Sequence, residues 1–333
     1  MPEIAPQRRA VLLLAHGTPQ SLEEIPAYLR NITGGRPMPE SVVEEIRHRY
    51  SLIGSSPLTE LTLEQGRLLS QALGLPVYVG MRNWKPYIAD VVRQMREEGI
   101  TSAVVICLAP QNSRTSVGLY RRAAFAEAAG IEMDFIDGWA DHPLLAQAFA
   151  DRLQPVWQSV AARIGMKPPV LFTAHSVPCR TIQSQPADDQ GAPALDPDPY
   201  PVEAKRTAAN VAARLAPLGL TASDWFFAFQ SQGMSGGTWI GPTVEATLTG
   251  LREEGHSAVV IQPIGFLCDH VEILYDVDIA FRDFGAHIGL EVVRPPSLND
   301  SSLLTAALED LVRQGFARLA TKVPSEALSA PAL

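Results

Sequence analysis

Cysteine is scarce in this chain, which limits its metal and redox chemistry. Cys107, Cys179 and Cys268 are the three cysteines among 333 residues, and no C-x-x-C pair occurs. Neither a cysteine-built zinc site nor a disulfide framework is therefore expected. Long apolar runs are also lacking, since every apolar stretch falls well short of the roughly 18 residues that a membrane-spanning helix requires. The first residues lack the apolar core of a signal peptide, so we expect a cytoplasmic protein without stable membrane insertion.

Positive charge is in deficit as well. The chain carries 27 Lys and Arg against 36 Asp and Glu, a formal net charge of −9. No dense run of Lys or Arg occurs, so neither nucleic acid nor anionic lipid is an expected partner. Apolar residues are abundant, at 46% hydrophobic against 19% charged, which excludes disorder for most of the length. At roughly 150 residues per domain, the length predicts two domains.

The chain contains one internal repeat. Residues 11–19 read VLLLAHGTP and residues 170–178 read VLFTAHSVP, and each is an apolar run that leads into Ala-His. Residues 86–99 (PYIADVVRQMREEG) and 242–255 (PTVEATLTGLREEG) form a second pair at nearly the same separation. Each member of this second pair leads into another apolar run. Two equivalent halves are therefore the simplest interpretation.

Apolar runs alternate with stretches of helical period in both halves, for example at 61–73 and 202–218. This alternation predicts an α/β fold of two Rossmann-like lobes with parallel, doubly wound sheets, related by internal duplication. Residues 180–201 are polar and proline-rich and predict a long loop over a strand end. We divide the chain into an N-terminal lobe at 10–145, a C-terminal lobe at 146–300, a helix at 301–320 and a tail at 321–333.

Two histidines occupy equivalent positions in the repeat. His16 and His175 each come directly after a buried strand. Ligands of open α/β sheets bind at that edge, and imidazole is both a common metal ligand and a base near neutral pH. A turn-capping imidazole is the alternative for each residue. The repetition favours two imidazoles that meet in one site.

An acidic cluster, CDHVEILYDVD at 268–278, follows another apolar strand. If a helix begins near His270, Glu272 and Asp276 are i,i+4 neighbours and need a positive charge beside them. Stabilisation by the helix dipole accounts for one acid but not for the whole cluster. The glycine-rich stretch at 231–242 lacks the Gly-Lys-Ser/Thr of a nucleotide loop. Trp239 within it instead predicts a wall for a flat ligand.

Taken together, these motifs resemble one family. AHSVP, DPYP, FAFQSQG, WIGP and PIGF-x-x-DH-x-E-x-LYD follow one another in this order, and the chain is similar to ferrochelatases from about residue 10 to about residue 315. The resemblance implies a porphyrin cleft between the two lobes and insertion of ferrous iron into a porphyrin. It also implies Fe²⁺ as a substrate with no permanently bound cofactor. Since the additional cysteines of some members are missing, no iron–sulfur cluster is expected.

The resemblance also implies roles for individual residues. His175 and Glu272 match the catalytic, metal-facing pair, and Asp276 matches an outer relay. The substrate-binding residues that it implies are Arg49, Tyr50, Ser56, Tyr120 and Trp239. His16 is a departure, because coproporphyrin-using members have a Tyr there that ligates product iron. Since cobalt and sirohydrochlorin chelatases carry a His in this motif, His16 is predicted to be axial to product iron. Ala280 is a second departure, where some members extend the acidic series.

The motifs constrain the identity of the porphyrin less than they constrain the reaction. LAPQNSRTSVGLYRRAA at 108–124 resembles the coproporphyrin-using form of this motif, which favours coproporphyrin III and coprohaem III as product in haem biosynthesis. One alternative is a protoporphyrin IX ferrochelatase that gives protohaem. Others are a porphyrin- or haem-binding protein without turnover and a chelatase that inserts cobalt or nickel into another tetrapyrrole. We further expect a monomer that passes haem transiently to an acceptor enzyme.

Overall fold

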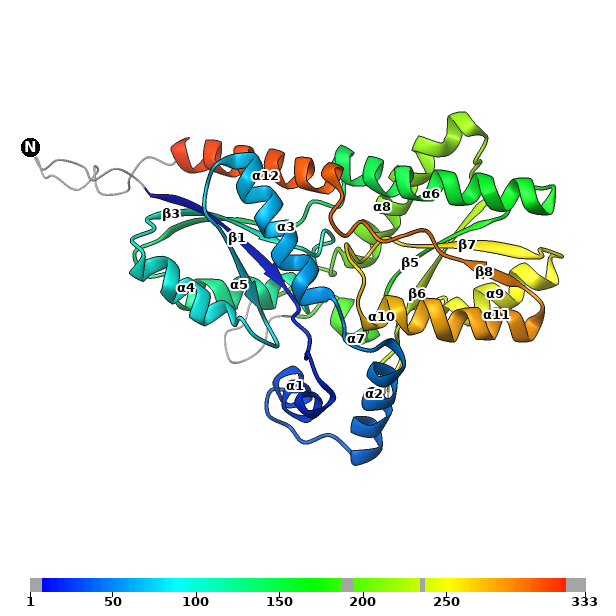
Figure 1. Cartoon of the computed structure of the whole chain (residues 1–333), viewed down its shortest axis with the longest axis horizontal. Helices are drawn as coiled ribbons and strands as arrows, with labels where there is room; N and C mark the ends of the chain where they lie inside the picture. Colours follow the sequence, from blue (N-terminus) through cyan, green and yellow to red (C-terminus); the bar gives the residue numbers. More distant parts are fainter. Residues whose placement is uncertain (1–7, 187–193, 234–236, 322–333) are drawn as a thin grey trace, which may run out of the picture.

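Two separate four-stranded sheets form the framework of the protein (Figure 1). The computed structural model describes residues 8–186, 194–233 and 237–321. Every strand pair in both sheets is parallel. The strands are β1 (Arg9–Ala15), β2 (Val77–Met81), β3 (Ser102–Cys107), β4 (Glu132–Ile136), β5 (Val170–His175), β6 (Trp225–Gln230), β7 (Ala258–Pro263) and β8 (Glu291–Val293).

The order of the strands repeats from one sheet to the other. The first sheet has the order β2-β1-β3-β4 and the second has the order β6-β5-β7-β8. Within each sheet, the strand that comes first in the sequence (β1 or β5) has a neighbour on both sides, as a doubly wound topology requires. The predicted α/β class, with two lobes related by duplication, is therefore confirmed.

Helices cover both faces of the sheets. In Figure 1, α6 and α12 run along the upper side, while α4, α5, α9 and α11 lie along the lower side. Among the described helices, none is both long and apolar enough to cross a membrane. The α-helices are α1 (Ile25–Ile32), α2 (Glu40–Ile53), α3 (Leu58–Leu73), α4 (Ile88–Glu97), α5 (Val117–Ala126), α6 (Pro143–Ile164), α7 (Cys179–Ile182), α8 (Tyr200–Leu215), α9 (Val244–Glu253), α10 (Val271–Leu274), α11 (Arg282–Ile288) and α12 (Ser302–Thr321).

Local backbone features repeat along with the strands. The backbone N–H of Met81 at the end of β2 donates to the Pro86 carbonyl at 2.6 Å, and that of Phe229 in β6 donates to the Pro242 carbonyl at 2.8 Å. The helices that follow, α4 and α9, are each followed by the glycine of an REEG sequence, with φ of 75° and 93°. A left-handed backbone of this kind favours glycine, which ends the helix. The sequence repeat therefore encodes the same strand–turn–helix unit twice.

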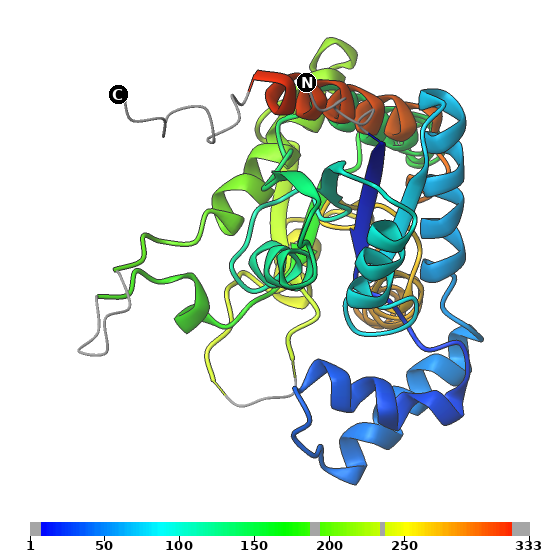
Figure 2. The same cartoon turned by 90° about the vertical axis from the view of Figure 1, so that its left-hand side faces the viewer.

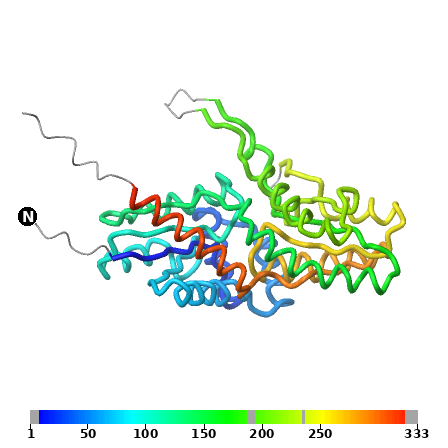
Figure 3. Tube along the Cα trace, turned by 90° about the horizontal axis from the view of Figure 1, so that it is seen from above, coloured from blue at the N-terminus to red at the C-terminus, as the bar shows by residue number. Residues whose placement is uncertain are grey.

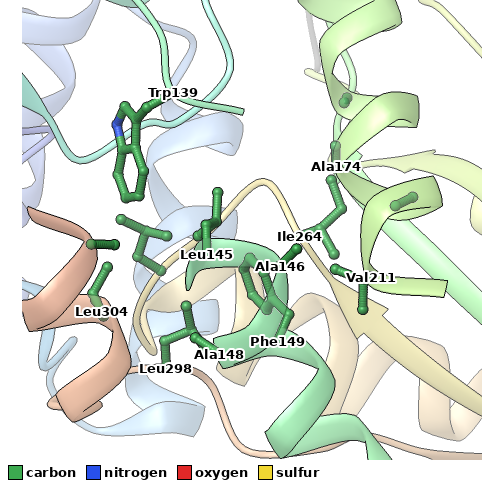
Figure 4. Packing of buried hydrophobic residues seen from close by; sticks show 14 of the residues in the cluster. Trp139, Leu145, Ala146, Ala148, Phe149, Ala174, Val211, Ile264, Leu298 and Leu304 are labelled. Carbon is green, nitrogen blue, oxygen red and sulfur yellow. The ribbon is translucent and has the colours of Figure 1, made fainter. Parts of the chain in front are cut away.

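One apolar cluster extends through both lobes. It contains Val104 of the first sheet, Phe172 of the second and Phe149 of α6, all of them buried. Figure 4 shows α6 residues lying between Leu304 of α12 and Val211 of α8. Removing a buried Phe side chain costs about 3–5 kcal/mol, so Phe149 stabilises both lobes at once. The predicted lobe boundary at residue 145 falls in the first turn of α6, which packs against elements on either side.

The last helix of the chain packs on the first sheet. Arg318 of α12 lies 2.8 Å from the buried carboxylate of Asp134 in β4. The backbone at Gly315 lies so close to β3 that a Cβ there would be 2.7 Å from the Val104 side chain. The helix expected at 301–320 is α12, and residues 322–333 of the expected tail lie outside the described residues.

Two segments project from the sheets near the strand ends. Figure 2 shows β1 pointing toward α1 and α2, which lie beneath the first sheet. The expected loop at 180–201 contains α7 and an antiparallel bridge between Gln185 and Leu195, and Figure 3 shows its two green arms leaving the body side by side. Residues 187–193 of this loop lie outside the described residues. Both segments adjoin the strand ends that carry His16 and His175.

Candidate active site

The centre of the candidate site is a contact between His175 and Glu272. His175 is the last residue of β5, and Glu272 lies in the first turn of α10, which follows β7. Because β5 and β7 are parallel neighbours, their carboxyl ends bring both side chains to one edge of the sheet. Nε2 of the imidazole is 3.4 Å from Oε1 of the carboxylate, and the side chains are 35% and 31% exposed. The structure therefore joins the two residues that the sequence predicts as the catalytic pair.

Attraction between the two groups sets their charge. Burial lowers the pKa of His175, but the Glu272 carboxylate and a hydrogen bond to the Ser176 carbonyl outweigh burial and raise it to about 9. Burial acts to raise the pKa of Glu272, yet His175 and His270 hold it well below its usual range. At neutral pH the pair is an imidazolium and a carboxylate. His175 can therefore act as a base only after it releases this proton.

A second imidazole contacts the same carboxylate, and the sequence analysis did not include it among the site residues. Nε2 of His270 is 3.8 Å from Oε2 of Glu272. Nδ1 of His270 donates to the Cys268 carbonyl at 3.0 Å, and its ring packs on Phe266 with centroids 4.5 Å apart. The DH pair of the PIGF-x-x-DH-x-E-x-LYD motif is the sequence feature that could have identified His270. Each oxygen of Glu272 thus faces one imidazole.

Asp276 begins a π-helical segment, Asp276–Phe281, that follows α10. Its carboxylate accepts a hydrogen bond from Ser231, and Nη1 of Arg49 lies 3.5 Å from Oδ1. Burial and the charge of Glu272 raise the pKa of Asp276 to about 6, although Ser231 and Arg49 act in the opposite direction. Only 11% of its side chain is exposed, against 31% for Glu272. Asp276 is thus the more enclosed of the two acids.

Arg49 supplies the positive charge that the acidic cluster requires, and it comes from the other lobe. It lies in α2, and its guanidinium stacks on the Tyr275 ring at 4.9 Å. Nε of Arg49 also donates to Glu45 at 2.9 Å. The cation is shared between Glu45, through Nε, and Asp276, through Nη1.

His16 follows β1 and is held in a neutral state. Its Nε2 is 3.1 Å from the Tyr28 hydroxyl. The Asn83 amide nitrogen is 3.0 Å from Nε2 and 3.2 Å from Nδ1, so the amide lies over the ring face and not in line with one lone pair. Burial lowers the pKa of His16 to about 4, and the charge of Arg82 adds to this effect. The charge of Glu272 acts in the opposite direction, which places His16 within its electrostatic range.

Two of the predicted substrate-binding residues have buried hydroxyls. The Tyr50 hydroxyl of α2 interacts with that of Tyr28, whereas within the described ranges Ser56 of the loop before α3 has a hydroxyl oxygen without a hydrogen-bond partner. Thr59 in the first turn of α3 shares this property, and the sequence analysis did not include it. An unsatisfied buried hydroxyl costs about 1–3 kcal/mol, a cost that a bound polar group removes. Ser56 and Thr59 are therefore candidates for contact with substrate.

Tyr120 is buried in α5 beneath an arginine that the sequence analysis did not include. The Arg82 guanidinium lies 5.3 Å from the centre of the Tyr120 ring, and its Nη1 donates to the Thr115 carbonyl at 3.3 Å. Arg82 is half-buried and makes no ion pair with any carboxylate in the part of the chain that the structure describes. Its position just after β2 at a strand end was the signal that could have found it. A half-buried cation of this kind attracts an anionic ligand.

Trp239 lies beside the segment that follows His175. Its backbone pairs in an antiparallel bridge with Pro178, three residues beyond the histidine. A Cβ on Gly233 would lie 2.6 Å from the indole, so the ring is packed directly against that backbone. Trp239 therefore lies beside the chain segment that leaves the end of β5.

Among residues 8–186, 194–233 and 237–321, no group of three His, Cys, Asp or Glu residues converges closely enough to hold a metal ion. A cavity of about 900 Å³ lies between α6, α11 and β8, and its lining includes Arg163, Asp278 and Arg294 but neither His175 nor Glu272. The ion pair and this cavity are separate features.

Similarity to known proteins extends over nearly the whole chain. The model of the family described as Ferrochelatase matches residues 8–316. The chain belongs to the ferrochelatase family. A ferrochelatase of Acidobacterium capsulatum is 65% identical over 327 residues, which are 97% of this chain and 99% of that protein. A coproporphyrin III ferrochelatase of Anoxybacillus flavithermus is 32% identical over 322 residues, which are 92% of this chain and 97% of that protein.

A solved structure supports the fold of this ferrochelatase. SirB from Bacillus subtilis, with Fe³⁺, matches with a TM-score of 0.54 and covers 95% of this chain and 98% of its own. Its sequence identity is 11%, so the likeness concerns the fold alone. The two parallel sheets of this ferrochelatase are thus arranged as in a chelatase.

Family membership fixes the class of reaction. This ferrochelatase is an enzyme that inserts a metal ion into a porphyrin, with haem as product. The alternative of a binding protein without turnover does not fit that family.

Proposed function

We propose that this ferrochelatase inserts Fe²⁺ into coproporphyrin III, with His175 and Glu272 as the groups that meet the pyrrole protons and the metal. The observation that carries the proposal is their ion pair, at 3.4 Å, on the ligand-binding edge of the second sheet. Insertion releases two pyrrole protons as Fe²⁺ binds the four ring nitrogens. The reaction therefore needs a proton acceptor and an anionic group beside one another, which is what His175 and Glu272 provide.

The charges of the unliganded pair suggest an order of events. Glu272 is anionic and attracts Fe²⁺, whose charge then opposes the proton on His175. His175, whose side chain is 35% exposed, releases that proton to solvent and can then accept one from a pyrrole nitrogen. The second pyrrole proton leaves by the same route after His175 has released the first. His270, on the other oxygen of Glu272, keeps the carboxylate oriented while this happens.

The charge of the substrate supports coproporphyrin III. This porphyrin carries four carboxylates and protoporphyrin IX carries two, so it requires more cationic and hydrogen-bonding partners. Arg82, which lacks a carboxylate partner within the described ranges, stands over Tyr120 in the 108–124 motif. The hydroxyl of Ser56 adds a further unsatisfied donor. Charge-assisted hydrogen bonds to carboxylates are the stronger kind.

The direct test is anaerobic incubation of the purified enzyme with Fe²⁺ and either porphyrin. Each hydrogen bond to a charged group contributes about 1.5–3 kcal/mol, so we expect kcat/KM to be roughly tenfold or more higher for coproporphyrin III. An equal or higher value for protoporphyrin IX would overturn the substrate assignment. Absence of metalation with both porphyrins would overturn the proposed reaction.

Arg82→Met is expected to raise the KM for coproporphyrin III by roughly tenfold, because one charge-assisted contact to a carboxylate is lost. The effect on protoporphyrin IX should be smaller. Arg121→Met is the matched control, since Arg121 lies on α5 but pairs with Asp137 at 2.6 Å on the surface. The same increase in KM for both porphyrins would show that Arg82 does not discriminate between them.

The His16 side chain is expected to ligate product iron. Because burial keeps it neutral, no proton has to leave before its nitrogen binds iron. Ferric coproporphyrin bound to the wild type should give imidazole-type optical and resonance Raman spectra, which His16→Ala should lose and His16→Tyr should convert to a phenolate type. Identical spectra for the wild type and His16→Ala would remove His16 from the ligands.

A further inference from the structure

The backbone of His175 is held by a tyrosine from the second lobe that the reaction itself does not require. The Tyr200 hydroxyl donates a hydrogen bond of 2.8 Å to the His175 carbonyl oxygen. Tyr200 is buried at the first position of α8, and its ring packs on Phe229 of β6 with centroids 6.4 Å apart. The phenol is therefore fixed by the sheet on one side and fixes the end of β5 on the other.

Asp198 fixes Tyr200 in turn. Its Oδ1 accepts a hydrogen bond of 3.0 Å from the backbone N–H of Tyr200, as a side chain ahead of a helix commonly does. The backbone N–H of Asp198 donates to the Ile182 carbonyl at 2.9 Å. The Asp198 side chain is 0% exposed. A carboxylate so deeply buried is tolerated only when all of its oxygens are paired.

The partner of the second oxygen comes from the first lobe. Oδ2 of Asp198 accepts from the backbone N–H of Arg114 at 2.8 Å, and Nε of Arg114 lies 3.5 Å away. Nη2 of the same guanidinium donates to the carbonyls of Thr181 at 3.0 Å and Gln183 at 2.9 Å. Arg114 belongs to the 108–124 motif of the first lobe. A continuous series of contacts thus joins this motif to the backbone of His175.

We propose that Tyr200 is a positioning residue for His175, and that Asp198 links its placement to the first-lobe loop at Arg114. The geometry supports positioning and not proton transfer. The phenol donates to a backbone carbonyl, which cannot accept or release a proton in the reaction, and it makes no contact with the imidazole. What the hydrogen bond fixes is the end of β5, and with it the direction of the imidazole toward Glu272. Loss of an outer partner of this kind typically reduces activity by about 10–100-fold.

The inference rests on the proposed role of His175, and it is tested by Tyr200→Phe in the full-length enzyme. This change removes one oxygen and keeps the ring, so the thermal midpoint should stay close to that of the wild type. We expect kcat to fall by roughly tenfold or more, with the porphyrin KM unchanged, because the phenol touches no substrate-binding residue. Asp198→Asn should also lower kcat, since it weakens the hydrogen bond from the Tyr200 backbone N–H that orients Tyr200.

Thr207→Val is the matched control on the same helix. Thr207 is also a buried hydroxyl that joins the lobes, through Gln111 at 3.1 Å and the Ala140 carbonyl at 3.0 Å, but it has no contact with the Tyr200–His175 path. The kcat of the Thr207→Val enzyme should remain near the wild-type value. The proposal is overturned if Tyr200→Phe keeps the wild-type kcat, or if Thr207→Val loses as much. The proposal is also overturned if the loss of kcat in Tyr200→Phe is fully explained by a smaller fraction of folded protein. If instead His175→Ala is active, the proposed function fails, whatever Tyr200→Phe does.

Discussion

His175→Ala is expected to reduce kcat for iron insertion about a hundred- to ten-thousandfold, the usual contribution of a positioned general base. Porphyrin binding should persist, because the carboxylates of the substrate are expected to meet Arg82, Tyr50 and Ser56. The side chain is 35% exposed at a strand end, so its removal leaves the packed core unchanged. The loss should therefore appear in kcat and not in the affinity for porphyrin.

Anaerobic single-turnover assays and quenching of porphyrin fluorescence separate these two quantities. His256→Ala is the control, because His256 lies near Glu254, at 3.8 Å, just after α9 and ahead of the first residue of β7. It should behave as the wild type. A near-wild-type rate for His175→Ala would show that proton acceptance lies elsewhere.

Glu272→Gln has the second largest expected effect. It keeps the shape of the side chain and removes the charge that attracts iron and holds the His175 proton. We expect kcat to fall about a hundredfold or more, and the titration of His175 to move. Its midpoint, followed by NMR of isotope-labelled histidine in the metal-free enzyme, should be about 9 in the wild type. In the variant, burial still lowers the pKa while the Ser176 carbonyl and Asp276 still raise it, so the midpoint should fall below about 9.

The same shift predicts how stability depends on pH. The folded pKa of His175, about 9, lies above its usual value of 6.5, so the ion pair contributes fully below pH 6.5 and is lost as the pH rises through about 9. The wild type should lose more thermal stability over this interval than Glu272→Gln. Glu245→Gln, an exposed acid in the first turn of α9, should follow the wild type. Parallel pH profiles for wild type and Glu272→Gln would contradict the ion pair.

Asp276→Asn should differ in kind from Glu272→Gln. Asp276 contacts Ser231 and Arg49 and not His175, so its loss should raise the apparent KM for Fe²⁺ with a smaller effect on kcat. Comparable losses of kcat in both variants would show that the two acids act as one unit.

Much of the fold was predictable because the information is local. An apolar run that ends in Ala-His, and a helix that ends in REEG, each specify a strand–turn–helix unit within a few residues. Their repetition predicted the duplicated parallel sheets. Placement of His175 and Glu272 at one edge followed from the rule that parallel strands share a carboxyl end.

Contacts between the lobes were not predictable in the same way. Arg49 pairs with Asp276, and Arg114 with Asp198, across sequence separations that no periodicity records. The packing of α12 on the first sheet, through Arg318 and Asp134, likewise joins residues 184 positions apart in the chain. His270 was visible in the motif, but only its distance to the carboxylate showed that Glu272 lies between two imidazoles.

The sequence by itself determined the duplication, the strand ends and the residue types that gather there, because hydrophobic period and turn chemistry act over a few residues. The tertiary structure alone decided the charge of those residues. A pKa of about 9 for His175 and about 4 for His16 depends on burial and on which charges from the other elements lie nearby. Two histidines equivalent in the repeat thus differ in protonation, since Glu272 contacts one while burial and Arg82 act on the other.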